Sequence, residues 1–480
     1  MKTNIGKVWT AVQNGFHFSA CSPLSGIRAA ICICVFLFTS CEGFVQVDTP
    51  PSQLTSGEVF EDPATAHAAM TELYAKMRDA GMLTGSPTGL SNALGNYADE
   101  LDFYGAVTHA ILPFYNNALL ASNGTVAGWW SQSYTVIYAA NALMEKVAIS
   151  KGLLEEDKLQ LTGEALFVRG LLHFYLVNLF GDIPYIKTTN YKENQKIGKE
   201  TPSRVYAKIL EDLNQAAELL SDEYIVSDRT RPNKAVVMAF MARVYLYNEQ
   251  WQEASNAASY VLNQTSLYAL EIDLNRVFLK ESASTLWQFV PRFDGQNTQE
   301  GETFIFTSTP PRLVALTEKL MQDFEQGDQR KEHWTASVSD GENTWYHPFK
   351  YKERTNTNTA KEYPILFRLA ELYLIRAEAR AHFGDLVSAK DDLDKIRLRA
   401  GLEPTSATSK DAILNAIIHE RRVELFTETG HRFFDLKRTG RLDVTLSPVK
   451  PGWNTTDHLM PIPENELMLN PNLSPQNPGY

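Results

Sequence analysis

Two helical hairpins far apart in the chain share one spacing of small residues, and this repeat narrows the folds that the chain can adopt. In the first copy, Ala242 and Ala254 stand twelve residues apart on either side of a short turn. In the second copy, Ala377 and Ala389 have the same spacing around Gly384. Small residues there let two antiparallel helices approach closely, as in the tetratricopeptide, a helix–turn–helix unit of about 34 residues. The repeat predicts a mostly α-helical fold of stacked hairpins.

The apolar periodicity predicts repeat hairpins over about 129–262 and 363–399. Before them, Asp62-Pro63 is typical of a helix start, with an Asp N-cap and proline in the first turn. Residues 81–128 and 264–360 break the helical pattern, and the second stretch holds short β-type runs. The predicted fold class is mostly α, with tetratricopeptide-like hairpins supporting an irregular, partly β region. Individual helices are expected at 129–147, 161–180, 203–220, 234–262 and 363–399.

The first 40 residues have the composition of a secretory signal peptide. They carry three basic residues and no Asp or Glu, and their apolar run, Ala29–Phe38, is too short to span a bilayer. The run ends Phe38-Thr39-Ser40-Cys41, which resembles a bacterial lipobox, although Phe38 stands where Leu is usual. We therefore expect a signal peptide over 1–40, a lipid on Cys41 and a tether over 41–57. A plain signal peptide, with Cys41 incidental, stays open as the alternative.

The cysteine positions support the lipid anchor. All four cysteines lie at positions 21, 32, 34 and 41, so a chain that begins at Cys41 holds one cysteine and forms no internal disulfide. A cysteine-based structural zinc site is excluded for the same reason. The formal net charge is −12, and an acidic balance repels phosphate backbones, so we expect no nucleic-acid partner.

We find no motif for catalysis, a metal or a cofactor. The sequence has no nucleophile elbow, phosphate loop or dinucleotide fingerprint, and His419-Glu420 lacks the second histidine that a zinc-binding helix needs. A pair of glycosidase carboxylates stays open, because such residues need not be neighbours in sequence. The dense acid–base block over 420–438 is interpreted as structural, with its members pairing to fix the C-terminal part on the hairpins.

The aromatic residues are the best signal for a ligand. Trp130, Trp251 and Trp287 fall in regular elements and are assigned to the core. Other aromatics lie in irregular segments or at their edges, where a ring can stack on the C–H face of a sugar while amide or guanidinium groups bind hydroxyls. Loop packing is the alternative for each one. The candidate ligand-binding residues, on 97–129 facing part of 291–350, are Tyr104, Tyr115, Asn116, Trp129, Arg292 and Trp345.

Five blocks in order along the chain resemble the SusD/RagB family of outer-membrane lipoproteins. They are Phe60 with Asp62; Tyr134 with Ala140 and Asn141; Arg169 with Phe174-Tyr175 and 180–185; 420–425 with 430–438; and 459–463 with 470–473 and 476–480. The likeness covers almost the whole of 58–480 and includes a C-terminal family block over 411–480.

The resemblance implies about four tetratricopeptide-like hairpins and an acylated protein on the outer face of the outer membrane. From the missing motifs we expect no enzyme activity and no cofactor. The resemblance also implies a nutrient ligand, a glycan oligosaccharide or in some branches a peptide, and a partner, a SusC-like TonB-dependent transporter. The other hypothesis is a repeat-based scaffold or assembly lipoprotein with no small-molecule ligand. The aromatic-rich insertions favour ligand capture over the scaffold.

Overall fold

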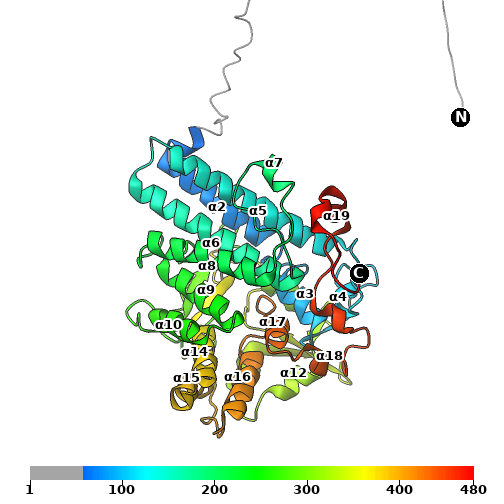
Figure 1. Ribbon diagram of the computed structural model, residues 1–480. Helices are drawn as coiled ribbons and strands as arrows, with labels where there is room; N and C mark the ends of the chain where they lie inside the picture. The colour runs from blue at the N-terminus through cyan, green and yellow to red at the C-terminus, as the bar shows by residue number, and fades with distance from the viewer. Residues whose placement is uncertain (1–57) are drawn as a thin grey trace, which may run out of the picture. The chain divides into compact units, whose positions relative to one another are not determined.

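The computed structural model describes residues 58–480, in which long helices stack one against the next (Figure 1). The expected signal peptide, the Cys41 lipid site and the tether lie outside the described residues. The mostly α fold class is confirmed. In stacking order the helices are α2 (Pro63–Asp79), α5 (Gly124–Ile149), α6 (Glu155–Phe180), α8 (Pro202–Leu219), α9 (Lys234–Tyr247), α10 (Trp251–Leu262), α14 (Leu369–Phe383), α15 (Leu386–Arg399) and α16 (Lys410–Glu424).

The two repeat copies are neighbours in space although they are not neighbours in sequence. All four of the spaced alanines are fully buried, and α10 of the first hairpin packs against α14 of the second. Trp251 stacks on the His382 ring across this boundary, with ring centroids 3.7 Å apart. The intervening residues 264–360 therefore leave the stack between two adjacent hairpins and return to it.

The sequence predicted which segments are helical better than it predicted the residues at which the helices begin. The Asp62 side chain caps α2 as expected, accepting from the Thr65 amide at 3.1 Å. The next helix was expected from Trp129 but begins at Gly124, because the Asn123 side chain accepts from the first free amides. The third begins at Glu155 and not at 161, and the last hairpin begins at Leu369 because a strand precedes it.

The two insertions are more ordered than the sequence indicated. Residues 81–128 contain α3 (Leu90–Tyr97), β1 (Leu101–Phe103) and α4 (Leu112–Tyr115). The strands form three antiparallel pairs, β1–β3, β2–β6 and β4–β5. The mixed stretch after α10 contains β2 (Thr285–Gln288), α11 (Gln299–Phe304), β3 (Val314–Leu316), α12 (Glu318–Asp323), α13 (Gln329–Trp334), β4 (Thr335–Ser339) and β5 (Thr344–Pro348), and β6 (Ile365–Arg368) follows it.

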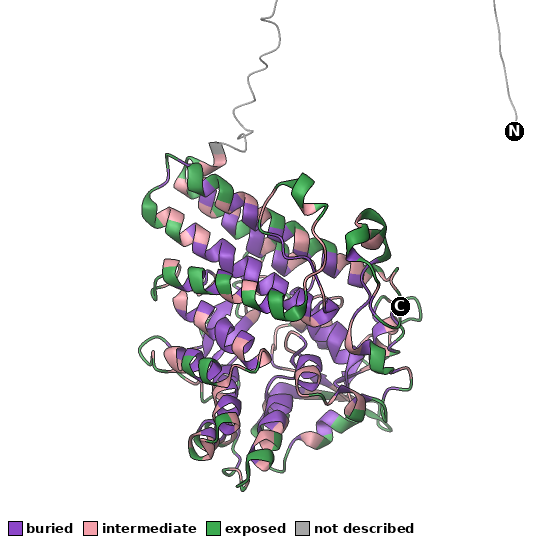
Figure 2. Ribbon diagram, in the orientation of Figure 1, coloured by how far each residue is buried: buried purple, intermediate pink, exposed green. Residues whose placement is uncertain are grey.

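The largest apolar core lies between the stacked helices and β2, as the buried inner faces in Figure 2 show. Trp287 on β2 is fully buried, and its ring contacts those of Tyr74, Phe167 and Phe367 at centroid distances of 5.7, 5.2 and 5.8 Å. The assignment of Trp287 to the core is confirmed. A second cluster around Trp334 lies under the insertion. The C-terminal part adds α17 (His431–Arg438), α18 (Leu442–Leu446) and α19 (Glu464–Leu469), and α7 (Tyr191–Asn194) precedes α8.

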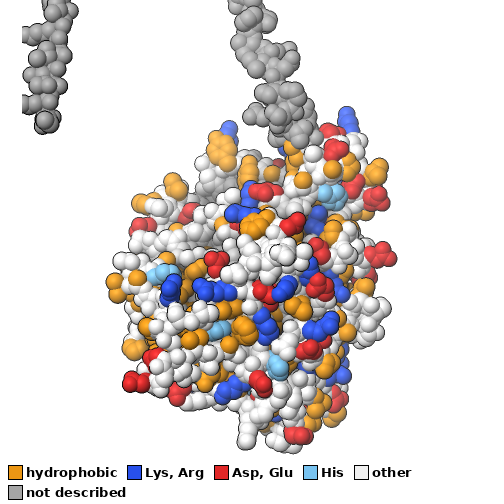
Figure 3. All heavy atoms as spheres, turned by 180° about the vertical axis from the view of Figure 1, so that it is seen from behind, with side chains coloured by type: hydrophobic (Ala, Val, Ile, Leu, Met, Phe, Trp, Pro, Cys, Tyr) orange, Lys and Arg blue, Asp and Glu red, His pale blue; other side chains and the backbone are white. Residues whose placement is uncertain are grey.

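The surface carries both signs of charge. On the face seen in Figure 3, acidic and basic side chains are interspersed with apolar ones. Within residues 58–480, no helix is both long and apolar enough to cross a bilayer. The same residues contain no group of three His, Cys, Asp or Glu side chains placed to hold a metal ion.

Candidate ligand-binding site

The two insertions meet along a short antiparallel strand pair. β1 pairs with β3 and places Phe103 opposite Val314, and the Tyr104 amide then donates to the Leu313 carbonyl at 2.7 Å. β5 packs beside β3. The two segments expected to hold the ligand therefore lie side by side.

Tyr104 and Trp345 form an exposed aromatic pair at this junction. The Tyr104 side chain is 41% exposed, Trp345 on β5 is half-buried, and the Trp345 indole lies close enough to the Tyr104 hydroxyl to influence its pKa. Burial and the nearby Asp102 carboxylate raise the pKa of Tyr104, so its hydroxyl stays protonated at neutral pH. Two rings from distant parts of the chain thus offer a surface on which a sugar ring can stack.

Tyr115, at the end of α4, lies close to this pair. Its ring centroid is 6.1 Å from that of Phe103, and the Lys450 ammonium lies 4.2 Å from the Tyr115 ring centroid. Lys450 also donates to the Asn96 carbonyl at 2.5 Å and to the Tyr115 carbonyl at 3.2 Å. Burial lowers the pKa of Lys450 to about 8, with Asp102 opposing the shift. The C-terminal family block therefore positions an aromatic residue of the first insertion.

A cleft of about 330 Å³ opens near the β1–β3 junction. Leu313 belongs both to the cleft lining and to the backbone contact with Tyr104. One wall is the loop at Ser86 and Pro87, and the other includes Gln299 on α11. Two guanidinium groups complete the lining, those of Arg312 and Arg354.

The two cleft walls are tied together by hydrogen bonds. The Thr84 hydroxyl donates to the Gln299 side-chain oxygen at 2.6 Å, and the Thr303 hydroxyl donates to the Gly85 carbonyl at 2.9 Å. A Cβ at Gly85 would lie 2.1 Å from the Glu300 carboxylate, so a larger residue here would require the Glu300 side chain to move. The cleft is therefore pre-formed.

None of the six candidate residues lines the cleft itself. Tyr104, Tyr115 and Trp345 lie together at the nearby β1–β3 junction, whereas the other three do not join them as expected. Trp129 lies inside α5, is 1% exposed, and donates its indole N–H to the Thr88 carbonyl at 2.9 Å. It is a core residue below the site and offers no face to a ligand. Arg292 lies 3.2 Å from the Asp79 carboxylate at the end of α2 and does not line the cleft. Asn116 is exposed at the end of α4, also outside the lining.

The sequence interpretation missed the polar part of the cleft. Gln299, Glu302, Arg312 and Arg354 were not singled out, because a polar side chain in a loop looks the same whether or not it faces a cavity. Phe306 is 8% exposed and contacts the His347 ring at a centroid distance of 4.9 Å. Its neighbours on either side are loop residues, so its place in the cleft also had no periodic signal.

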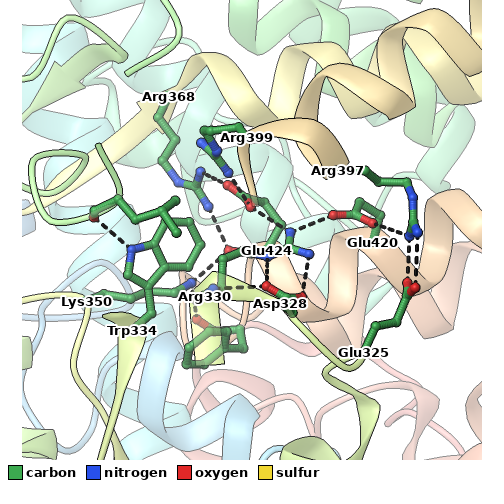
Figure 4. Close-up of polar contacts among 12 residues, drawn as sticks. Glu325, Asp328, Arg330, Trp334, Lys350, Arg368, Arg397, Arg399, Glu420 and Glu424 are labelled. Atoms are coloured by element: carbon green, nitrogen blue, oxygen red, sulfur yellow. Dashed lines mark hydrogen bonds and ion pairs between the residues drawn. The ribbon is translucent and has the colours of Figure 1, made fainter. Parts of the chain in front are cut away.

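A buried charge cluster holds the second insertion on the hairpin stack (Figure 4). At its centre, the Glu424 carboxylate on α16 accepts from Arg368 and Arg399 at 2.5 Å each and from Arg330 at 3.0 Å. Although burial acts to raise it, these guanidinium groups hold the pKa of Glu424 well below its usual range. The Lys350 ammonium donates to the Glu424 carbonyl at 2.8 Å.

The partners in this cluster come from separate elements. Arg330 on α13 and Lys350 after β5 belong to the insertion that carries Trp345, whereas Arg399 lies on α15 and Glu424 on α16. The cluster therefore fixes the aromatic surface relative to the repeat helices. The structural interpretation of the acid–base block is confirmed, since its members are buried and paired across elements.

Both halves of the chain match known protein families. Residues 64–246 match a family described as starch-binding and associating with the outer membrane. Residues 240–480 match the SusD family. The chain belongs to the SusD family. The expected family resemblance is thus confirmed.

Two solved SusD structures and one curated relative align over most of this SusD-family chain. SusD-like protein P2 of Formosa agariphila is 29% identical and aligns over 90% of this chain and 96% of its own. A laminarin-binding SusD-like protein superposes with a TM-score of 0.73 at 25% identity, over 87% of this chain and 99% of its own. A SusD superfamily protein of Bacteroides vulgatus superposes with a TM-score of 0.77 at 23% identity, over 88% of this chain and 100% of its own.

Membership of the SusD family sets the coarse biochemical class. SusD-like proteins are carbohydrate-binding proteins and not enzymes, and they are outer-membrane lipoproteins of the cell surface. The ligand of this chain, its partner and its anchor are matters for the proposal below.

Proposed function

We propose that this SusD-family lipoprotein is anchored in the outer membrane through Cys41, binds a nutrient oligosaccharide, and delivers it to a SusC-like TonB-dependent transporter. The observation that carries the proposal is that the exposed Tyr104 and the half-buried Trp345 lie together next to Leu313, a residue that also lines the cleft. A relative that binds laminarin, at 25% identity, supports a glycan as the ligand. A peptide ligand is the alternative, and the binding experiment below distinguishes it from a glycan.

The geometry suits a sugar that must later be released. Aromatic faces bind the C–H face of a pyranose, and polar groups such as Gln299 then bind its hydroxyls. Each hydroxyl exchanges water for a protein hydrogen bond, with a net gain of only about 1 kcal/mol. We therefore expect modest affinity, which is what a protein that passes its cargo onward needs.

Removing both exposed rings should nearly abolish saccharide binding. The double variant Tyr104→Ala, Trp345→Ala should bind oligosaccharides at least about 30-fold more weakly, because roughly 2 kcal/mol of stacking is lost. Its melting temperature should stay close to that of the wild type, since neither side chain belongs to a buried cluster. Isothermal titration calorimetry, with ligands chosen from an oligosaccharide array, measures the first effect and calorimetric melting the second.

Tyr191→Ala is the matched control, because Tyr191 is 67% exposed and lies on α7, outside both insertions. It should bind like the wild type. Wild-type binding by the double variant would place the site elsewhere. A wild type that captures peptides and no saccharide, or that captures neither, would reject the glycan proposal, and the last result would favour the scaffold hypothesis.

The transporter partner should co-purify with this protein. A stable complex buries more than about 1,000 Å² of surface, so mild detergent extraction and affinity purification should recover the TonB-dependent barrel encoded beside it. An unrelated tagged outer-membrane lipoprotein serves as the control for non-specific recovery. Isolation of the protein alone, while the neighbouring barrel is expressed, would contradict the proposed partnership.

A further inference from the structure

We infer that the saccharide bound in the cleft is anionic, and that Arg312 and Arg354 bind its carboxylate or sulfate groups. The inference rests on the proposed saccharide-binding function and names the class of ligand for the same site. Both guanidinium groups line the cleft of about 330 Å³ near the β1–β3 junction. Guanidinium groups bind carboxylate and sulfate oxygens through charge-assisted, often bidentate hydrogen bonds.

The cleft arginines differ from most others in the described part of the chain. Most arginines of residues 58–480 lie within 4.0 Å of a carboxylate, as Arg169 does with Asp212 and Arg243 with Glu371. Within those residues, no Asp or Glu side chain lies that close to Arg312 or Arg354. Their donor groups are therefore not taken up by ion pairs and are available to a ligand.

The one recorded side-chain contact of these two residues is weak. The Arg354 guanidinium donates to the Thr307 hydroxyl at 3.5 Å, the long limit for a hydrogen bond. Because the Thr84 hydroxyl already donates to the Gln299 oxygen, the Gln299 amide nitrogen is left as a further donor in the cleft. The lining is therefore rich in donors, and an acceptor-rich ligand complements it.

Glu302 adds an acceptor to the cleft, which suits a ligand that carries hydroxyl groups as well as anionic groups. It is the one carboxylate in the cleft lining and is exposed there. Two guanidinium groups and one carboxylate leave the cleft with a local charge of +1, on a chain whose formal net charge is −12. A carboxylate accepts from sugar hydroxyls, whereas the two guanidinium groups bind the anionic substituents. An acidic sugar satisfies both.

Matched pairs of oligosaccharides test this inference. An array should carry uronate oligosaccharides beside their methyl esters, and sulfated galactan oligosaccharides beside their desulfated forms. The wild type should bind the anionic member of at least one pair with an affinity about 10-fold or more above that for its neutral counterpart. The double variant Arg312→Gln, Arg354→Gln should lose about 10- to 100-fold in affinity for that member, which corresponds to one or two charge-assisted hydrogen bonds. A difference in affinity within the uronate pair would identify a carboxylate ligand, and a difference within the sulfated pair would identify a sulfate ligand.

Arg204→Gln is the matched control, because Arg204 is exposed on α8 and lies outside the cleft lining, so it removes a charge elsewhere. The Arg204→Gln variant should bind saccharides like the wild type. Raised salt should weaken the binding of the anionic oligosaccharide and leave the binding of neutral oligosaccharides unchanged. Equal affinity for the anionic and neutral members of every pair would overturn the inference and leave the saccharide-binding function intact. Wild-type affinity of the Arg312→Gln, Arg354→Gln variant for the anionic member would do the same. If no saccharide binds, neutral or anionic, the proposed function fails together with the inference.

Discussion

Replacing Glu424 with Gln should destabilise the fold by about 3 to 5 kcal/mol, the usual effect of removing one partner from a buried ion pair. The Glu424 carboxylate is fully buried and accepts from Arg330, Arg368 and Arg399. Gln keeps the shape and removes the charge, so three buried guanidinium groups lose their shared counter-ion. Urea unfolding followed by circular dichroism, with the midpoint and slope fitted separately, measures the change.

Glu325→Gln is the control for this experiment. Glu325 also pairs with an arginine, at 2.6 Å from Arg397, but its side chain is 43% exposed, so the loss should stay below about 1 kcal/mol. The pH dependence gives a second check. The pKa of Glu424 is lowered in the folded state. Its contribution to the free energy of unfolding is therefore fully present above the ordinary carboxyl pKa and is lost as the pH falls through the lowered pKa. A Glu424→Gln variant as stable as Glu325→Gln would show that the cluster does not hold the insertion.

Replacing Cys41 with Ser should move the protein completely from the membrane fraction to the soluble fraction. The apolar run ends in a lipobox-like sequence, and Cys41 is the last cysteine of the chain. Several acyl chains on one residue make a durable anchor, because each buried methylene contributes about 0.8 kcal/mol. Cell fractionation measures the shift, and intact mass of the wild type should show an acylated Cys41 at the N-terminus.

Cys21→Ser is the control, because Cys21 lies within the predicted signal peptide and should leave fractionation unchanged. The melting temperature should not change in either variant, since the stacked helices begin only at α2. A Cys41→Ser protein that stays with the membrane, or a wild type with an unmodified Cys41, would reject the anchor and leave a plain signal peptide as the explanation.

The hairpins could be predicted because their signals are local. The Asp62 cap, the apolar periodicity and the paired alanines all act within one or two helical turns. The structural interpretation of the acid–base block also succeeded, because so many charges in a helical stretch need partners. Glycine-rich starts were harder. Gly124 and Gly128 lower helix propensity in the first turns of α5, and this hid the true start and placed Trp129 wrongly at a loop edge.

The candidate site could be predicted only in part, for a physical reason. Tyr104, Tyr115 and Trp345 were identified as aromatic residues in loops, which composition alone can indicate. Arg312 and Arg354 were not identified, because an unpaired guanidinium is recognised only when its surroundings are known. Arg292 was chosen by type and turned out to pair with Asp79.

By itself, the sequence determined the mostly α class, the repeat and the aromatic content of the insertions, and it predicts secretion and a lipid anchor. Only the tertiary structure decided that the two repeat copies are neighbours, that β1 joins β3, and that Trp345 meets Tyr104. Helix signals recur every three or four residues and can be read along the chain. A strand pair of three residues, and a carboxylate shared by arginines from three elements, depend on contacts between residues far apart in sequence, and such contacts have no period to detect.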